Sequence, residues 1–275
     1  VGSGLAGYAV ARELRKINVE IPIIMLTGDH GGFYSKPMLS NALASGKTPE
    51  SIINGDAMHM ASQLKISIRP HCRVTAIDQH KQALMLMNGE EIFYDQMVLA
   101  LGADQVRLPL TGSGVEKILS VNDLDDYKKF RDQLIDKKRI SIIGAGLIGC
   151  EFANDLAAAG YQVDVIDISS QPLGRLLPPE GGAFLRKKLE ATGVVFHLNM
   201  STQSVEQENG SLRLTFANGT SIESDLVLSA VGLLPRIHLA AAAGIKINRG
   251  IMVNRMLQTH YANIYAIGDC AEVEG

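Results

Sequence analysis

A run of glycines in the middle of the chain has the spacing of a phosphate-binding turn. Residues 139–151 read RISIIGAGLIGCE, an apolar β-branched run that turns through Gly144, Gly146 and Gly149 into a helix. The first glycine permits a tight turn, the second lets backbone N–H groups approach a pyrophosphate, and the third lets the helix pack closely on the strand. The N-terminus of the helix adds N–H donors and a partial positive charge. This stretch therefore predicts a binding site for the phosphates of a nucleotide.

The residues that follow supply the elements that must position such a turn. Phe152, Leu156 and Ala159 lie at helical spacing, and a second strand ends at Asp167. Asp167 lies 18 residues beyond Gly149, close to the offset of about 20 at which an acid accepts hydrogen bonds from an adenosine ribose. A carboxylate there repels a 2′-phosphate, so the pattern favours NADH over NADPH. The alternative is an ordinary glycine turn in an α/β protein.

A second glycine motif opens the chain. Residues 2–7 read GSGLAG, and a helix follows to about Lys16, but no strand precedes the motif. A doubly wound sheet needs that strand at its centre. We therefore expect these 275 residues to be the interior of a longer polypeptide, truncated at both ends.

The order of elements after the first motif recurs after the second. Each motif is followed by a helix, a strand, a loop, Asn-Gly hairpin turns and a strand that ends in a glycine, at Gly102 and at Gly232. We predict an α/β fold with two Rossmann-like domains, the second inserted in the first. The first domain would comprise residues 1–105 and 236–275, and the second residues 106–235.

A third signal lies near the end of the sequence. The strand-like run at 264–267 delivers Gly268 and Asp269 at its carboxyl end, where ligands of open α/β sheets bind. A carboxylate there can accept hydrogen bonds from sugar hydroxyls, although Gly-Asp alone is more typical of a plain turn.

Composition and charge exclude several other classes. The net charge of −3 gives no general attraction to nucleic acid or to anionic membranes. The sequence has no signal peptide and no run of about 18 apolar residues, so we expect no membrane insertion. Cys72, Cys150 and Cys270 are scattered, and the seven histidines are not grouped, so we expect neither a disulfide framework nor a metal site. This use of cysteine suits a cytoplasmic protein.

Together the motifs resemble the FAD-dependent pyridine-nucleotide reductase family. They are GSGLAG at 2–7, GAGLIGCE at 144–151 and THYANIYAIGD at 259–269, and they span nearly the whole chain. Residues 34–40, 144–156 and 263–272 are similar, more closely, to the rubredoxin–NAD reductases of alkane-degrading bacteria. The resemblance implies an NADH-dependent, FAD-containing reductase, a flavoprotein oxidoreductase that passes electrons to a rubredoxin in support of alkane hydroxylation.

The resemblance also implies that the first domain binds FAD and the second binds NADH. The residues implied for FAD are Gly2, Ser3, Gly4, Leu5, Ala6, Gly7, Lys36, Pro37, Val74, Ala100, Gly102, Arg107 and Asp269. Those implied for NADH are Gly144, Gly146, Leu147, Ile148, Gly149, Glu151, Asp167, Arg175 and Gly232. Because the flavin is the redox centre, Lys36 and Glu151 are predicted only to tune it. Glu151 is also explained as an acid near a helix N-terminus, and Arg175 as a solvated side chain.

Three positions depart from the family pattern. Leu101 stands where the family usually has a threonine, so it cannot donate a hydroxyl hydrogen bond. Gln105 replaces the usual proline before an arginine that contacts FAD, which weakens the assignment of Arg107. The acid that usually closes the second strand of the first domain is displaced, which leaves Asp29 as the candidate ribose ligand.

The cysteines bear on which reductase this is. Disulfide reductases need two cysteines close together beside the flavin, because a thiolate attacks the substrate disulfide and its partner resolves the intermediate. No such pair is present, and residues 33–40 lack the single cysteine of related peroxidases and coenzyme A disulfide reductases. We therefore expect direct electron transfer to a rubredoxin or another small iron protein. The alternatives are a ferredoxin reductase of an oxygenase system, an NADH oxidase, or a flavoprotein with a mainly binding role.

Overall fold

The computed structural model describes residues 1–274, whose contacts divide the chain into two compact units. Unit 1 comprises Val1–Ser35, Ile53–Asp104 and the chain from Leu233 onward, and unit 2 comprises Lys36–Ile52 and Gln105–Gly232. The chain therefore passes from one unit to the other four times.

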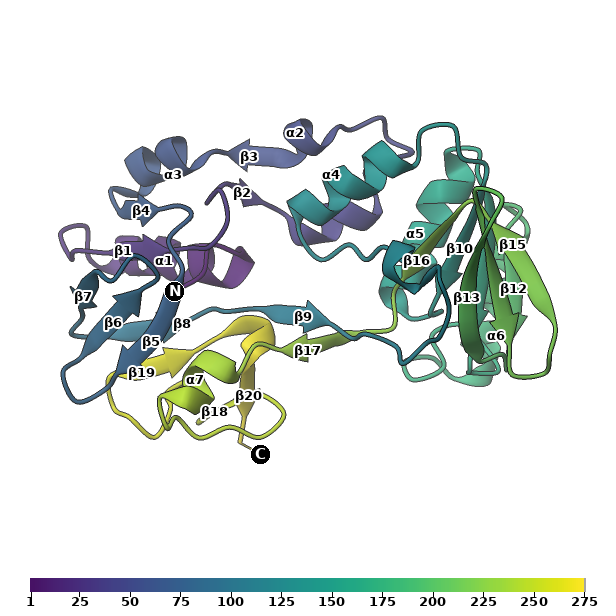
Figure 1. The fold of residues 1–275 in the computed structure, drawn as a ribbon. Coiled ribbons are helices and arrows are strands. Elements are labelled where there is room, and N and C mark those ends of the chain that lie inside the picture. The colour runs from purple at the N-terminus through teal and green to yellow at the C-terminus, as the bar shows by residue number, and fades with distance from the viewer. Residues whose placement is uncertain (275) are drawn as a thin grey trace. The chain divides into compact units, whose positions relative to one another are not determined.

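The centre of unit 2 is a parallel sheet with the strand order β12-β11-β10-β16. Figure 1 labels β10, β12 and β16 among its strands. Its strands are β10 (Arg139–Ile143), β11 (Gln162–Asp167), β12 (Val195–Leu198) and β16 (Leu226–Ser229), and its crossover helices are α5 (Leu147–Ala158) and α6 (Pro179–Glu190). All residues of β10 after Arg139 are buried, as expected of a strand that is covered on both faces. The order of strands and helices is that of the predicted Rossmann-like unit.

A three-stranded antiparallel sheet packs on the parallel sheet of unit 2. Its strands are β13 (Thr202–Glu208), β14 (Ser211–Phe216) and β15 (Ser221–Ser224). Burial alternates along β14, and its buried Leu212, Leu214 and Phe216 share one apolar cluster with Ile143 of β10 and Ile166 of β11. Such alternation is typical of a strand with one face on the core and one in solvent.

The Asn-Gly pairs at 88–89, 209–210 and 218–219 lie in the predicted hairpin turns, but their backbones differ. Asn209 and Gly210 both have positive φ, 47° and 87°, as a type I′ turn requires. At Asn88-Gly89 and Asn218-Gly219 only the glycine has positive φ. In these two turns the asparagine Oδ1 accepts a hydrogen bond from the N–H two residues further on, which is an Asx turn.

Unit 2 also contains a segment from early in the sequence. Within Lys36–Ile52 lie η1 (Lys36–Ser40) and α2 (Pro49–Ile52), and unit 2 further contains η2 (Val115–Lys117) and α4 (Leu124–Gln133). From the sequence, residues 36–52 are predicted to belong to the first domain. The structure groups them with unit 2, because their contacts and hydrogen bonds run to α4 and α5. The assignment of one cofactor to each unit stays a prediction.

In unit 1 the first two residues run between parallel strand pairs. These pairs are β1 (Ile24–Leu26) with β4 (Ser67–Arg69), and β8 (Met97–Leu99) with β19 (Ile264–Ala266). The Gly2 N–H donates to the Leu26 carbonyl at 2.8 Å, and the Ala100 N–H donates to the Val1 carbonyl at 2.8 Å. The first glycine motif therefore begins at the carboxyl ends of β1 and β8.

Unit 1 contains two apolar clusters and several further helices and strands. They are α1 (Leu5–Ile17), α3 (Ala57–Leu64), α7 (His238–Ala242), η3 (Gly268–Cys270), the antiparallel β5 (Val74–Asp78), β6 (Ala83–Leu86) and β7 (Glu91–Phe93), and the pairs β2 (Phe33–Tyr34) with β3 (Ile53–Gly55), β9 (Ala103–Gln105) with β17 (Leu233–Pro235), and β18 (Ile251–Val253) with β20 (Ala271–Val273). One cluster joins Leu86, Leu99 and Ile264, and the other joins Tyr8 of α1 to Met60 of α3. Within residues 1–274 no helix is long and apolar enough to cross a membrane.

Candidate functional site

The glycine turn of unit 2 has the close backbone approaches that its sequence predicts. Gly144 has φ +111°, and its N–H donates to the Ile166 carbonyl of β11 at 2.7 Å. A Cβ at Gly149 would lie 1.9 Å from the Gly144 carbonyl oxygen, so a side chain there would collide with the backbone. The strand, turn and helix can therefore pack this closely because Gly144 and Gly149 have no side chains.

Gly146 leaves space where a phosphate group would approach. It is the N-cap of α5, and nothing within 4 Å would meet a Cβ placed on it. No side chain among the described residues caps this helix end. The next two residues, Leu147 and Ile148, are 53% and 44% exposed. Open space, N–H donors at a helix N-terminus and exposed apolar side chains are the features that a dinucleotide needs.

Asp167 contacts the glycine turn directly. Its Oδ2 accepts the Ala145 N–H at 2.5 Å, and its Oδ1 accepts the Ser169 N–H at 2.7 Å. The side chain is only partly buried at the carboxyl end of β11. The carboxylate therefore fixes the backbone of the turn and lies at the sheet edge where a ribose would bind.

Two further predicted residues of the second site lie on segments beside this turn. Gly232 follows β16, the neighbour of β10, and its carbonyl accepts the Val106 N–H at 3.1 Å. Arg175 is exposed, two residues after Leu173, whose N–H donates to the Ala145 carbonyl at 2.8 Å. Leu173 has φ +52°, which is unusual for a bulky residue. Strand pairing and this hydrogen bond thus bring both segments to the glycine turn.

Glu151 lies in the second turn of α5 and accepts a hydrogen bond from the Ser40 hydroxyl. The effect of the helix dipole is largest within the first turn, so this contact gives Glu151 a more specific partner than the dipole. Lys36 belongs to the same segment as Ser40, and its Nζ donates to Asn122 Oδ1 at 2.7 Å. The carbonyl of Pro37 accepts from Asn41 Nδ2 at 2.8 Å. Both residues that were predicted to tune the flavin therefore make hydrogen bonds within unit 2.

The glycine turn of unit 1 repeats the geometry of the turn in unit 2. Gly2 has φ +108°, and a Cβ there would lie 2.1 Å from the Ala100 carbonyl oxygen. A Cβ at Gly7 would lie 2.0 Å from the Gly2 carbonyl oxygen, whereas Gly4, the N-cap of α1, has nothing within 4 Å. The predicted residues Gly2, Gly4, Gly7 and Ala100 therefore lie together around one turn.

A carboxylate also lies at the first turn, but it is held differently. The Oδ1 atom of Asp29 accepts the Ser3 hydroxyl at 2.9 Å, the Thr27 hydroxyl at 2.7 Å and the Gly31 N–H at 2.8 Å. Burial alone would raise the pKa of Asp29, but these hydrogen bonds outweigh it and lower the pKa below its usual value. The candidate ribose ligand of the first unit is thus tied to Ser3 of the glycine motif.

The segment with Asp269 packs against the start of α1. A Cβ at Gly268 would lie 2.9 Å from the Cβ of Ala6, which follows Leu5 in the first turn of the helix. Asp269 follows in η3 and is exposed. Unit 1 therefore places Leu5, Ala6 and Asp269 beside the first glycine turn.

The other predicted FAD residues divide between the two units. Val74 begins β5, two residues after Cys72, whose N–H donates to the Thr27 carbonyl at 2.7 Å. Gly102 follows β8, and its carbonyl accepts the Arg236 N–H at 3.0 Å. Arg107 belongs to unit 2 and is exposed, so unit 1 by itself does not bring it to the first turn.

Sequence reasoning missed several polar contacts of these segments. Arg236 donates from Nε to Asp104 at 2.6 Å and from Nη1 to the Leu101 carbonyl at 3.2 Å. It therefore lies beside residues 100–102, which include Leu101 in place of the family's threonine. Ser40, Asn122 and Asp155 hold the segment that carries Lys36. The sequence gives one sign of these contacts, because Asp155 is an acid among the apolar residues of α5.

The three cysteines are free thiols. Burial, with the nearby charges of Asp167 and Glu151, raises the pKa of Cys150 to about 11, and burial raises the pKa of Cys270. Thiols with raised pKa are poor nucleophiles at neutral pH. Across residues 1–274 no cluster of histidine, cysteine or acidic residues is suited to a metal ion.

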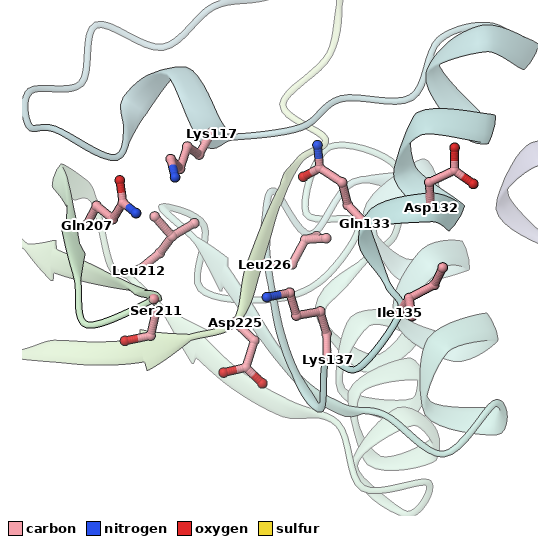
Figure 2. Close-up of a pocket in the computed structure, with 11 residues that line it drawn as sticks. Lys117, Asp132, Gln133, Ile135, Lys137, Gln207, Ser211, Leu212, Asp225 and Leu226 are labelled. Carbon is pink, nitrogen blue, oxygen red and sulfur yellow. The ribbon is translucent and has the colours of Figure 1, made fainter.

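A separate cleft lies at the other end of the unit 2 sheet. It has a volume of about 320 Å³ and is lined by residues such as Lys137, Ser211, Asp225 and Leu226 (Figure 2). Asp225 and Lys137 precede the amino ends of β16 and β10, whereas the glycine turn follows the carboxyl end of β10. The cleft is therefore distinct from the predicted dinucleotide site, since ligands of such sheets bind at the carboxyl ends.

Comparison with known proteins places this geometry in a family. The model of the family described as pyridine nucleotide-disulphide oxidoreductase matches residues 1–275. The rubredoxin-NAD(+) reductase of Acinetobacter baylyi is 48% identical over 282 residues, and that of Alcanivorax borkumensis is 44% identical over 276 residues. Each match covers 100% of this chain and 72% of the relative.

Solved structures agree with the sequence relatives. The ferredoxin reductase of Rhodopseudomonas palustris matches with a TM-score of 0.93 at 30% identity, over 100% of this chain and 68% of that chain. The complex of putidaredoxin reductase with putidaredoxin matches with a TM-score of 0.91 at 30% identity, over 100% of this chain and 67% of that chain.

These matches confirm three sequence predictions: the family, an α/β fold with two Rossmann-like units, and FAD and NADH as cofactors. The roles of individual residues stay predictions. Because the family match covers all 275 residues and two relatives exceed 40% identity across the chain, this chain belongs to the pyridine nucleotide-disulphide oxidoreductase family.

Proposed function

We propose that this protein transfers electrons from NADH through FAD to a rubredoxin. It is an NADH-dependent, FAD-containing reductase, and the identity of the acceptor is the part that we propose. The observation that carries the proposal is the identity of 48% and 44%, over the whole chain, to two rubredoxin-NAD(+) reductases. A small iron–sulfur protein as partner also agrees with the structural match to the putidaredoxin reductase–putidaredoxin complex.

The residues present fit two dinucleotides. Each unit has a glycine turn whose first and last glycines admit no Cβ and whose middle glycine, Gly4 or Gly146, faces open space. Each turn leads into a helix without a side-chain cap, so its N–H groups are available to a pyrophosphate. We assign FAD to unit 1 and NADH to unit 2, where Asp167 would accept from the adenosine ribose.

Bound FAD supplies the redox chemistry, since a flavin accepts hydride from a nicotinamide and can pass single electrons to an iron centre. The protein binds and orients the two cofactors. Leu147 and Ile148 would cover the NADH with apolar surface and exclude water, and Glu151 and Lys36 would set the charge near the reacting rings. None of these residues needs to gain or lose a proton.

The thiols support direct transfer without a disulfide relay. A relay needs two sulfur atoms close enough to bond and at least one accessible thiolate. Cys150 and Cys270 are buried with raised pKa, and the three cysteines are unpaired. Free thiols also agree with a reducing compartment, and we propose a cytoplasmic location and a role in alkane degradation.

The acceptor is tested by direct competition. The full-length protein, with FAD bound, is supplied with NADH and with a rubredoxin, a [2Fe–2S] ferredoxin or oxygen, and kcat/KM is measured for each at one ionic strength. We expect kcat/KM for rubredoxin to exceed that for ferredoxin by about 100-fold, which is about 3 kcal/mol of discrimination. Equal values, or a preference for oxygen, would reject the proposed acceptor.

The second candidate is a ferredoxin reductase of an oxygenase system. It is favoured by the 30% identity and TM-score of 0.93 to the reductase of Rhodopseudomonas palustris. The same experiment separates the two candidates, because a ferredoxin reductase would show the reverse order of kcat/KM.

A further inference from the structure

Helix α5 carries two carboxylates that hold the same distant segment. Glu151 and Asp155 are four residues apart, and so lie on one face of the helix. Glu151 accepts the Ser40 hydroxyl. The Oδ2 and Oδ1 atoms of Asp155 accept the N–H groups of Leu43 and Ala44, each at 2.9 Å.

Asp155 lies where a carboxylate is unfavourable. It is 5% exposed, and the structure records no salt bridge to it from any residue in 1–274. It also lies in the last turn of α5, where the helix dipole repels negative charge. A buried charge in such a place is retained only when hydrogen bonds satisfy it, and the two consecutive backbone N–H groups do so.

The segment that Asp155 holds carries the predicted flavin lysine. Lys36–Ile52 leaves unit 1 after β2 and returns to it at β3, two strands that pair with each other. Between these points Lys36 donates to Asn122, and Arg131 donates to the Lys47 carbonyl at 2.8 Å. The Asp155 carboxylate accepts two of the hydrogen bonds that hold the middle of the segment on α5, both from backbone N–H groups.

We propose that Asp155 is a positioning residue for hydride transfer. Its carboxylate fixes the turn at Leu43 and Ala44 on α5, and thereby sets Ser40 against Glu151 and sets the position of Lys36. The same helix begins at the glycine turn for NADH, so one rigid element positions the nicotinamide nucleotide and the segment that carries Lys36. The kinetic part of this inference rests on the proposed function, whereas the structural part does not.

The expected signature is a slower chemical step with unchanged binding of NADH. Asp155 lies six residues beyond Gly149, about 9 Å along the helix axis, so its replacement leaves the glycine turn intact. Asn at this position offers one acceptor oxygen and turns an NH₂ group toward the second N–H donor. The turn at Leu43 and Ala44 should therefore loosen.

The test uses the full-length protein with FAD bound, as Asp155→Asn and as the control Asn154→Ala. Asn154 is the exposed neighbour on the same helix. In Asp155→Asn we expect about tenfold slower bleaching of the flavin at saturating NADH, an NADH Kd within about twofold of wild type, and faster hydrogen exchange at the Leu43 and Ala44 amides. The control should match wild type in all three measurements.

Unchanged exchange at these two amides, or unchanged bleaching with loosened amides, would overturn the inference. If thermal unfolding shows that Asp155→Asn does not fold, Ser40→Ala tests the same segment through its bond to Glu151, and wild-type bleaching in that variant would also overturn it. A wild-type protein that NADH bleaches but that does not reduce rubredoxin would reject the proposed acceptor and leave this inference standing.

Discussion

The two glycine turns of this protein have similar backbone angles and close approaches but differ in how each holds its acid. In both, the first glycine has φ close to +110°, and its N–H donates to a carbonyl near the carboxyl end of the next strand, from Gly2 to Leu26 and from Gly144 to Ile166. In unit 2 the following residue is Asp167, which accepts the Ala145 N–H directly. In unit 1 the corresponding position is Thr27, and the acid comes two residues later at Asp29.

The carboxylate beside each glycine turn is therefore held by a different set of hydrogen-bond donors. Among the described residues, Asp167 accepts hydrogen bonds from the backbone N–H groups of Ala145 and Ser169, so its position depends on the fold of the turn. Asp29 accepts two hydroxyl groups and one N–H, so its position also depends on the side chains of Ser3 and Thr27. The carboxylate of unit 2 should therefore be sensitive to backbone changes, and that of unit 1 to substitutions of the two hydroxyl residues.

The largest expected effect comes from the last glycine of each turn. A Cβ in Gly149→Ala would lie 1.9 Å from the Gly144 carbonyl oxygen, and one in Gly7→Ala 2.0 Å from that of Gly2. We expect each substitution to lower the free energy of unfolding by about 3 kcal/mol, since backbone must move to admit the methyl group. Thermal or urea unfolding measures this loss.

The matched control is the middle glycine, because a Cβ at Gly146 or Gly4 meets nothing within 4 Å. Gly146→Ala should fold as wild type but bind NADH about tenfold more weakly, because the methyl group enters the space for the pyrophosphate. A stable Gly149→Ala protein, or a Gly146→Ala protein with normal NADH affinity, would contradict this assignment of roles.

Asp167→Asn is expected to change cofactor choice. The variant loses the negative charge that repels a 2′-phosphate, so the ratio of kcat/KM for NADH to that for NADPH should fall by about tenfold. It also weakens the bonds to Ala145 and Ser169, at a cost of about 1–2 kcal/mol in stability. Steady-state kinetics with both nucleotides check the first effect, and Asp29→Asn, which lies in the other unit, should leave the ratio unchanged.

Asp29→Asn is expected to change the pH dependence of stability. The hydrogen bonds to Asp29 lower its folded pKa, so its contribution to stability is fully present above the unfolded pKa of about 3.9 and is lost as the pH falls through the lower folded pKa. The difference in unfolding free energy between wild type and Asp29→Asn should be largest near neutral pH and should shrink below about pH 4. A difference that is constant across this range would show that the charge of Asp29 does not contribute.

The smallest effect on turnover is expected from the cysteines. Replacement of Cys72, Cys150 and Cys270 together by Ala should keep acceptor reduction within about twofold of wild type, because the proposed electron path includes no thiol. Stability should fall by about 1 kcal/mol for each buried position. Loss of acceptor reduction in a folded, FAD-loaded triple variant would instead indicate that a thiol takes part in electron transfer.

The sequence predicted best what is local. The strand, turn, helix and acid from Arg139 to Asp167 lie within 29 residues, and their backbone preferences and glycine spacing act over that range. The docking of Lys36–Ile52 on α5 depends on the bonds of Glu151 and Asp155 to residues 111 and 112 positions away. Neither hydrophobic periodicity nor turn residues indicate contacts between residues so far apart in the sequence. The packing of residues 36–52 on α5 was therefore not predicted. The sequence showed that Asp29 was displaced, but not that two hydroxyl groups hold it.

The pairing of β8 with β19 affects how the chain folds while it is being synthesised. Met97 and Ile264 lie opposite each other, so 167 residues separate the two strands along the chain (264 minus 97). As the chain leaves the ribosome, residues 105–232 emerge and can fold while β8 still has one open edge. An open strand edge pairs readily with other chains, so this interval is the one in which a nascent molecule most needs protection. The segment of Gly268 and Asp269, which packs against Ala6 at the start of α1, therefore joins the first glycine turn only after the rest of that turn has been made.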